Sequence, residues 1–162
     1  MNIDNLVKNI KPLDRSAMEK AEDRLNNLVK PQGSLGVLED LVIQLAGITG
    51  DTIPRVENKM VVVMAGDHGV VEEGVSAAPQ SVTPQMVYNF LHGGAGINVL
   101  ARCAGAKVKV VDVGVADETL VHQNLISRKV RLATANMTKG PAMSREEALQ
   151  ALKIGIEIAE GE

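Results

Sequence analysis

An apolar run near the middle of the chain ends abruptly in a small polar tip. Residues 60–65 read Met-Val-Val-Val-Met-Ala, a β-branched and uncharged run that is typical of a strand buried on both faces of a parallel sheet. Gly66, Asp67, His68 and Gly69 follow directly. Because ligands of open α/β sheets bind beyond the carboxyl ends of strands, Asp67 and His68 are candidates for lining a site. The alternative is that Asp67 caps or braces the loop.

Two helices are predicted ahead of this strand. Ser16 opens a capping-box pattern (S-x-x-E), and apolar residues then recur at helical spacing as far as Val29. Proline and two glycines interrupt that pattern, after which Ser34 is placed to cap a second helix. This helix is expected to end near one of two later glycines, Gly47 or Gly50.

Two further strands are predicted after the tip. In residues 107–113 lysines alternate with valines at first, so the beginning of this strand is expected to be partly exposed and its end buried. Asp112 near that end is another candidate site residue, with an exposed edge carboxylate as the alternative. Residues 127–133 carry two arginines and predict a third strand that lies at an edge or is buried on one side only.

Helices are expected between and after these strands. Thr83-Pro84 is the pattern of a helix start, a hydroxyl cap followed by proline at the first helical position. A short helix is expected over residues 97–104, and Ser144 with Glu147 opens a last helix with another capping box. This order of elements predicts an α/β fold with a mostly parallel sheet and right-handed crossovers. Because the last helix should lead into another strand, the sheet is expected to be incomplete, to be finished by further chain or by a second copy.

Composition excludes several classes of protein. The 162 residues are enough for one ordinary domain, and 45% hydrophobic with 23% charged residues is close to the globular average. The net charge is only -3 and no basic run is present, so nucleic acid is not an expected partner. No apolar stretch approaches the roughly 20 residues that span a bilayer, so a membrane is not expected either. The single cysteine, Cys103, predicts a cytoplasmic protein in which it is a small packed hydrophobe rather than a nucleophile.

Local motifs give no common cofactor or metal site. Neither a G-x-G-x-x-G after a strand nor a G-x-x-x-x-G-K-[ST] loop is present, so no nucleotide cofactor is expected. The glycine-rich residues 93–96 either cradle a phosphate or form a bend between two helices. The three histidines are widely separated, and no metal is expected. Glu72 and Glu73 beside His68 either bind a metal or form a solvated loop face.

Five segments carry a resemblance to a known family because they occur together in one order. They are Lys30-Pro-Gln-Gly-Ser-Leu-Gly36, Ala65-Gly-Asp-His-Gly-Val70 with Glu73-Gly-Val75, residues 79–83, residues 85–91 and Asn136-Met-Thr-Lys-Gly-Pro-Ala-Met143. From about residue 5 onward the chain resembles the amino-terminal half of the nicotinate-nucleotide:dimethylbenzimidazole phosphoribosyltransferases, which are pentosyltransferases of cobalamin biosynthesis.

The resemblance implies a fold and an assembly. The family's larger domain is a Rossmann-like three-layer sandwich, and its small helical domain combines segments from both ends of the chain. Residues 1–34 would then be the helical segment of the small domain, and residues 35–162 the amino-terminal half of the α/β domain. A homodimer is expected.

The resemblance also implies a reaction and a binding site. The family moves the phosphoribosyl group of nicotinate mononucleotide to a ring nitrogen of 5,6-dimethylbenzimidazole, which releases nicotinate and forms α-ribazole 5'-phosphate. The residues that would face the benzimidazole are Ala78, Pro79, Gln80, Gln85 and Met86. Family members can carry serine at the position of Ala78, so a hydrogen bond made there would be missing and base selectivity would change.

No catalytic residue is assigned within the 162 residues. The family's general-base glutamate and its main phosphate loop lie beyond residue 162, so this chain alone is expected to be inactive in transfer. Two alternatives from other classes stay open: a non-catalytic α/β module that binds aromatic bases, and an assembly module whose sheet edge pairs with another copy.

Overall fold

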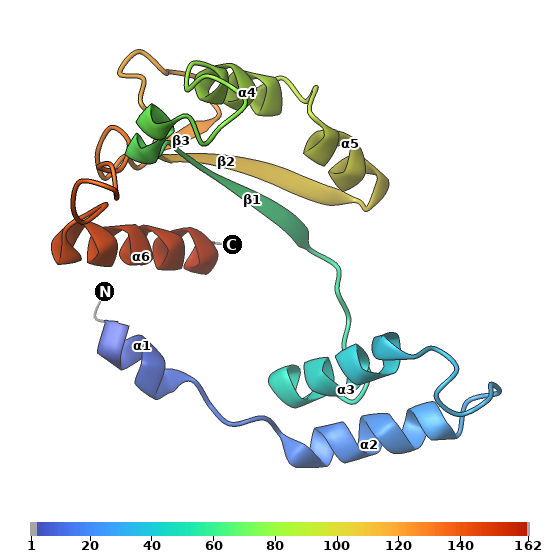
Figure 1. Cartoon of the computed structure of the whole chain (residues 1–162). Helices are drawn as coiled ribbons and strands as arrows, with labels where there is room; N and C mark the ends of the chain where they lie inside the picture. Colours follow the sequence, from blue (N-terminus) through green and yellow to red (C-terminus); the bar gives the residue numbers. More distant parts are fainter. Residues whose placement is uncertain (1–2, 162) are drawn as a thin grey trace. The chain divides into compact units, whose positions relative to one another are not determined.

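The computed structural model describes residues 3–161 and divides the chain into two compact units, Met1–Glu57 and Asn58–Glu162 (Figure 1). The sequence placed a boundary after residue 34 instead. The two divisions differ because the second predicted helix packs against the first one. Whether the helical unit belongs to a small domain, as the resemblance implies, stays a prediction.

The helical unit holds α1 (Ile3–Asn9), α2 (Arg15–Asn26) and α3 (Val37–Thr49). Helices α2 and α3 bury a small alanine cluster, made of Ala17, Ala21 and Ala46. Gly47 permits this close packing, since a Cβ there would lie 2.7 Å from the Met18 side chain. The unit is therefore held by close contact between two small-residue helix faces.

The two helix starts predicted in the helical unit are wrong. Asp14 caps α2 instead of Ser16, because its Oδ1 accepts a hydrogen bond from the Ala17 N–H at 3.0 Å while its own N–H is donated to Gly47 O. Helix α3 begins after Gly36 without a side-chain cap, so Ser34 does not cap it. Of the two glycines expected near the end of this helix, Gly50 is the one that ends α3, with a left-handed φ of 73°.

The side chain of Glu39 holds the loop between the end of α2 and the start of α3. The Glu39 carboxylate accepts hydrogen bonds from Lys30 Nζ at 2.8 Å and from the Leu35 N–H at 3.0 Å. These bonds hold the loop outside both helices, so α2 stops at Asn26 and does not reach Val29. They also hold the pKa of Glu39 below its usual value, the Lys30 hydrogen bond being the main cause.

The second unit is built on a parallel sheet of β1 (Lys59–Gly66), β2 (Ala106–Gly114) and β3 (Leu125–Ser127), in the order β1-β2-β3. The prediction of a parallel α/β fold is thereby confirmed. Ala65 pairs with Asp112, and the register then shifts so that Gly66 pairs with Gly114. The carboxyl ends of β1 and β2 thus meet at one edge, where the polar tip begins.

The predicted third strand is misplaced, because β3 ends at Ser127 where the prediction began. Beyond it the chain crosses the end of β2 in separate hydrogen bonds, with Arg128 N donating to Asp112 O at 2.8 Å and Val130 N donating to Val113 O at 3.1 Å. Ala133 has a left-handed φ of 57°, which an extended strand does not allow. Residues 128–133 therefore form an irregular segment along the sheet edge.

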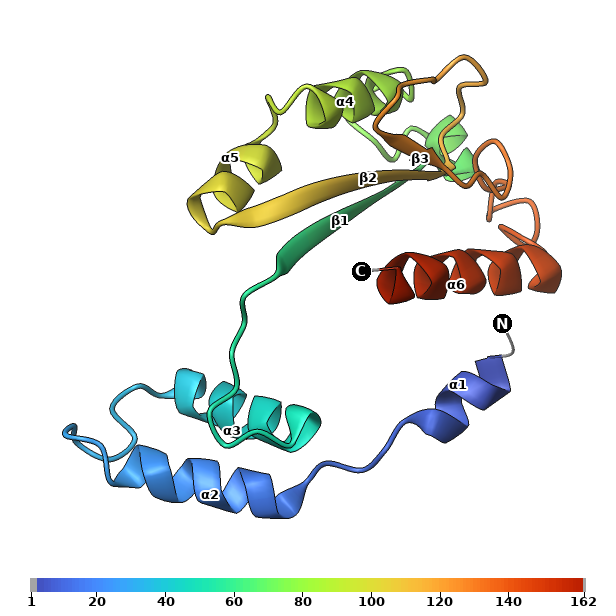
Figure 2. The same cartoon turned by 180° about the vertical axis from the view of Figure 1, so that it is seen from behind.

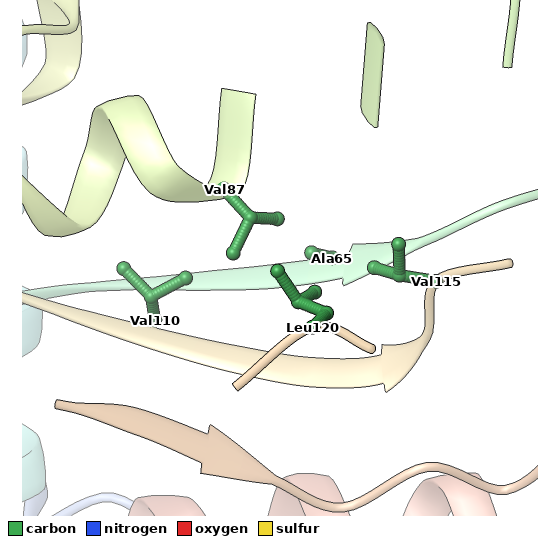
Figure 3. Close-up of a cluster of buried hydrophobic side chains, with 5 residues drawn as sticks. All are labelled: Ala65, Val87, Val110, Val115 and Leu120. Atoms are coloured by element: carbon green, nitrogen blue, oxygen red, sulfur yellow. The ribbon is translucent and has the colours of Figure 1, made fainter. Parts of the chain in front are cut away.

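Helices lie on both sides of this sheet, as Figures 1 and 2 show. Helices α4 (Val82–Leu91) and α5 (Gly96–Cys103) cover one face, and α6 (Arg145–Glu160) lies on the other. The main core lies under α4 and comprises Ala65, Val87, Val110, Val115 and Leu120 (Figure 3). Three layers result, as the Rossmann-like prediction required.

The prediction that β1 is buried on both faces is wrong. Val62 and Met64, on the face away from Val87, are 37% and 42% exposed. Val63 and Ala65 alternate with them and face α4, where Ala65 is buried. On this far side, Glu147 and Ala151 of α6 lie beside the carboxyl ends of β1 and β2, where they line a pocket with Gly66 and Gly114.

The sequence predicted the cap of α6 correctly and the cap of α4 wrongly. Ser144 and Glu147 form the predicted capping box of α6, with bonds of 3.2 and 2.7 Å, so that prediction is confirmed. Helix α4 begins at Val82 without a side-chain cap, so Thr83 does not cap it. Its hydroxyl is used elsewhere, in the site described below.

Cys103 ends α5 and is exposed, so the expectation of a packed cysteine is wrong. Asn98 and Ala101 form the buried side of this helix, and Cys103 lies off that side. Among residues 3–161, no helix has the length and apolar character that a membrane span needs.

Candidate functional site

The polar tip after β1 is pressed against a distant segment of the chain. His68 forms a parallel bridge with Thr134, and the Gly69 N–H is donated to Thr134 O at 3.1 Å. A Cβ on Gly69 would lie 2.6 Å from Thr134 O and 2.7 Å from Asn136 N, both backbone atoms. Glycine is therefore required at 69 by close approach of the backbone. The tip then continues as the short helix η1 (Gly69–Glu73).

The Asp67 carboxylate braces the tip, which is the alternative that the sequence left open. Asp67 is buried, and its Oδ1 accepts a hydrogen bond from the Thr83 hydroxyl at 2.6 Å. Its Oδ2 accepts one from the Ala116 N–H at 2.8 Å. The carboxylate thus joins the end of β1 to the first turn of α4 and to the turn after β2.

A pocket of about 460 Å³ opens beside this brace. Its wall comes from β1, the tip, the loop over residues 75–80 and one side of α4, and is mostly apolar. Six of the eight candidate site residues line it: Asp67, His68, Ala78, Pro79, Gln80 and Met86.

Gln85 does not line the pocket and is exposed on α4. At about 100° per residue, the lining positions of α4 fall on one side of the helix, and Gln85 lies outside that side; these positions are Val82, Thr83, Met86, Val87 and Phe90. Sequence proximity placed both residues in the site, and helix geometry in this unit separates them.

The pocket wall offers few hydroxyl groups to a ligand. Ser76 Oγ donates a hydrogen bond to Ala78 O at 2.9 Å, and Thr83 donates its hydroxyl proton to Asp67. His68 is exposed, with Nδ1 3.5 Å from Thr134 Oγ1. Both lining hydroxyls therefore serve the loop structure, and the surface that remains suits a flat apolar ring.

A polar cluster beside the tip was not predicted as a unit. Asn136 is buried, and its Nδ2 donates hydrogen bonds to Glu73 Oε1 at 2.7 Å and Glu72 Oε2 at 3.3 Å. Lys139 Nζ lies 2.6 Å from Glu72 Oε2, and this bond is the main reason that the pKa of Glu72 is lowered. These bonds join two of the sequence segments that carried the resemblance.

Asp112 does not line the pocket, and its exposed-edge alternative is wrong. The residue is fully buried, and its Oδ1 accepts hydrogen bonds from the Gly114 and Val115 N–H groups at 3.0 and 2.9 Å. Its Oδ2 forms an ion pair with Lys129, which also donates to Val115 O at 2.8 Å. No local signal could reveal this pair, because Lys129 lies beyond β3 in the sequence.

The glycine-rich residues 93–96 form a bend between α4 and α5. Asn98 Oδ1 accepts a hydrogen bond from the Ala95 N–H at 3.2 Å, and Arg102 Nη1 donates to Gly93 O at 3.0 Å. The structure thus favours the bend over the phosphate cradle. Among the described residues, no group of three or more His, Cys, Asp and Glu side chains is arranged to hold a metal ion.

Comparison with known proteins gives one consistent family. A family model described as phosphoribosyltransferase matches residues 10–162. The nicotinate-nucleotide–dimethylbenzimidazole phosphoribosyltransferase of Clostridium acetobutylicum is 52% identical over 157 residues, which are 97% of this chain and 44% of that protein. The enzyme of the same name from Desulforamulus reducens is 56% identical over 146 residues, or 90% of this chain and 42% of that protein.

Solved structures agree with these relatives. The crystal structure of CobT from Thermus thermophilus matches with a TM-score of 0.84 and 50% identity, covering 90% of this chain and 44% of that one. A second crystal structure from the same organism, of the phosphoribosyltransferase, matches with a TM-score of 0.85 and 49% identity, over 92% and 47%. The chain thus spans less than half the length of the proteins it matches.

Proposed function

The chain belongs to the phosphoribosyltransferase family, and we propose that, in a protein of its relatives' length, it transfers the phosphoribosyl group of nicotinate mononucleotide to 5,6-dimethylbenzimidazole. The observation that carries this proposal is the apolar pocket beside the polar tip, which four of the five residues assigned to the base line together. Its volume of about 460 Å³ lies within the usual range of small-molecule sites.

The wall of the pocket fits a flat aromatic base. Ala78 and Pro79 leave room for the ring, and the thioether of Met86 is a polarizable partner for its π face. In the reaction, a ring nitrogen of the base attacks the anomeric carbon, the bond to nicotinate breaks, and the proton on the other ring nitrogen is removed. The residues described here supply the base pocket of this scheme.

Asp67 is not the proton acceptor in this proposal. Asp67 is 8% exposed and each of its oxygens already accepts a hydrogen bond, so a proton taken from the substrate would weaken the bonds that join the end of β1 to α4 and to the turn after β2. The acceptor is instead the glutamate that the resemblance places beyond residue 162. We therefore expect the 162 residues alone to bind the base and to form no α-ribazole 5'-phosphate.

The test is a titration of 5,6-dimethylbenzimidazole with the 162-residue chain, followed by the fluorescence of the ligand. The chain has one tyrosine and no tryptophan, so its own emission is weak. Saturable binding is expected, weakened about 10-fold or more by Met86→Ala, because part of the pocket wall is removed. The matched control, Gln85→Ala, should leave the affinity unchanged, since Gln85 is exposed on the same helix outside the pocket.

Two outcomes would count against the proposal. One is the lack of saturable binding at millimolar base, and the other is an equal loss of affinity in both variants. With the chain extended to the relatives' length, nicotinate and α-ribazole 5'-phosphate should form in equal amounts. Transfer by the 162 residues alone would refute the assignment of the proton acceptor.

The cytoplasmic location and the homodimer also belong to this proposal and rest on the sequence resemblance and the single cysteine. Sedimentation of the extended protein at several concentrations tests the dimer. A monomer at every concentration would remove it from the proposal.

A further inference from the structure

We propose that Asp67 is a positioning residue for base binding: its carboxylate sets the place of α4 relative to the carboxyl edge of the sheet and so sets the width of the base pocket. The inference rests on the proposed function for the identity of the ligand. Its structural part concerns residues of the Asn58–Glu162 unit alone.

The first support is the reach of this one side chain. Asp67 accepts hydrogen bonds from the Thr83 hydroxyl at 2.6 Å and from the Ala116 N–H at 2.8 Å. These two donors lie 16 and 49 residues later in the chain. Asp67 is 8% exposed, so water competes little for either bond. We call the two hydrogen bonds of Asp67, to Thr83 and to Ala116, the bracket. Hydrogen bonds to a charged carboxylate are stronger than those to a neutral side chain.

The second support is the connection between the bracket and the pocket wall. Thr83 and Met86 both line the pocket and lie three residues apart on α4, so they share one side of that helix. A displacement of Thr83 away from Asp67 would carry Met86 with it. The distance between Met86 and the Ala78-Pro79 side of the pocket therefore depends on the Asp67–Thr83 bond.

The third support is that the other end of the bracket is itself fixed. Asp112 holds the turn after β2 by accepting the Gly114 and Val115 N–H groups, and Lys129 holds both Asp112 and Val115 O. The Ala116 N–H is thereby presented to Asp67 from a rigid turn. A movement at the bracket must consequently be taken up by α4, which carries the pocket wall.

Four variants separate positioning from general support of the fold. Asp67→Ala removes both bonds. Asp67→Asn can keep both, because its amide oxygen can accept from Ala116 while its NH₂ donates to the Thr83 oxygen. Thr83→Val removes only the hydroxyl at nearly constant volume, and Thr83→Ser keeps it. If Asp67→Ala does not fold, the Thr83 pair still tests the bracket.

We expect Asp67→Ala and Thr83→Val to weaken the binding of 5,6-dimethylbenzimidazole at least about 10-fold, the loss expected for one hydrogen bond. Asp67→Asn and Thr83→Ser should stay within about 3-fold of the unaltered chain, because they retain the bracket. Without ligand, the NMR signal of the Met86 methyl group should move in the first pair and stay in place in the second. A merely stabilising residue would not give this loss of affinity in variants that are fully folded, since stability alone does not change the affinity of a folded chain; rescue by the conservative variants assigns the loss to the two hydrogen bonds.

The outcomes distinguish the two proposals. Equal affinity and an unmoved Met86 methyl signal in Thr83→Val would overturn the positioning role, as would an equal loss in all four variants. If the unaltered chain binds no base, the proposed function fails, and the Met86 signal in the four variants still decides whether Asp67 positions α4.

Discussion

Replacing Lys129 by methionine should destabilise the Asn58–Glu162 unit more than any change of a surface lysine. The perturbation keeps most of the side chain's length and apolar stem but removes its charge. Asp112 is 0% exposed, and its Oδ2 has Lys129 as its ion-pair partner. The variant therefore leaves a carboxylate without a counter-charge inside the protein.

The magnitude follows from the partners that remain. Breaking a buried ion pair from one side costs about 3–5 kcal/mol in the free energy of unfolding. Asp112 Oδ1 keeps its two N–H donors and the lysine is 22% exposed, which lowers the effect, whereas the bond from Lys129 to Val115 O is lost in addition. We expect a loss of about 3 kcal/mol, at the lower end of that range.

Urea unfolding followed by tyrosine fluorescence measures this loss in the correct unit. Tyr88 is the only tyrosine, no tryptophan is present, and Tyr88 packs against the core under α4. The signal therefore reports the Asn58–Glu162 unit and not the helical unit. With a slope of about 1.5 kcal/mol per molar urea, the midpoint should fall by about 2 M.

The matched control is Lys139→Met, the same change in the same unit. Lys139 and Glu72 are 67% and 60% exposed, so their ion pair contributes less than about 1 kcal/mol. Adding Asp112→Asn to Lys129→Met should restore part of the stability, because no buried charge is then left unpaired. Equal midpoints for the two lysine variants would refute the reasoning.

Two further predictions concern other close contacts. Gly69→Ala should lower the free energy of unfolding of its unit by about 2–3 kcal/mol in the same urea assay, because the new Cβ meets backbone atoms of residues 134–136. Gly140 has open space around it, so the control Gly140→Ala should change this free energy by less than about 0.5 kcal/mol, and equal effects of the two variants would contradict the prediction. The Glu39 carboxyl carbon should titrate in NMR below pH 4.5, and Lys30→Met should bring the midpoint back toward 4.5. Because the pKa of Glu39 is lower in the folded chain, the stabilisation by this pair is present above the unfolded pKa and is lost as pH falls through the folded pKa. A titration midpoint of Glu39 at or above 4.5 would contradict the prediction.

The sequence predicted those parts of the fold that depend on neighbours in the chain. The apolar run over residues 60–65, the capping box of Ser144 and the left-handed Gly50 each have a local signature, and each is found where it was expected. Strands alternating with helices then led to the parallel sheet. These are the features for which a short window of sequence holds the cause.

The errors have the opposite origin, in contacts between residues far apart in the sequence. The end of β3 depends on hydrogen bonds to β2, and the exposure of Val62 depends on where α6 lies. Thr83 has the pattern of a cap, yet Asp67, 16 residues earlier, takes its hydroxyl proton in a hydrogen bond. Gln85, which the resemblance placed beside Met86, is exposed on α4 and does not line the pocket.

The two buried aspartates show why carboxylates at this edge of the sheet are weak evidence for acid–base chemistry. The carboxyl ends of parallel strands lead into turns whose N–H groups lack partners, and a carboxylate satisfies two of them at once. Asp112 does this for Gly114 and Val115, and Asp67 does it for Ala116 together with the Thr83 hydroxyl. Both occupy the place where an α/β enzyme binds its ligand, and both are already committed to the scaffold.

The same reasoning constrains where the proton acceptor must come from. Within residues 3–161, Asp67 is the one carboxylate that lines the pocket, and each of its oxygens already accepts one hydrogen bond. A benzimidazole that occupies the pocket as proposed would weaken these two hydrogen bonds if it passed its N–H proton to Asp67. The proposed reaction therefore favours a proton acceptor other than Asp67. This agrees with the glutamate that the sequence resemblance implies beyond residue 162.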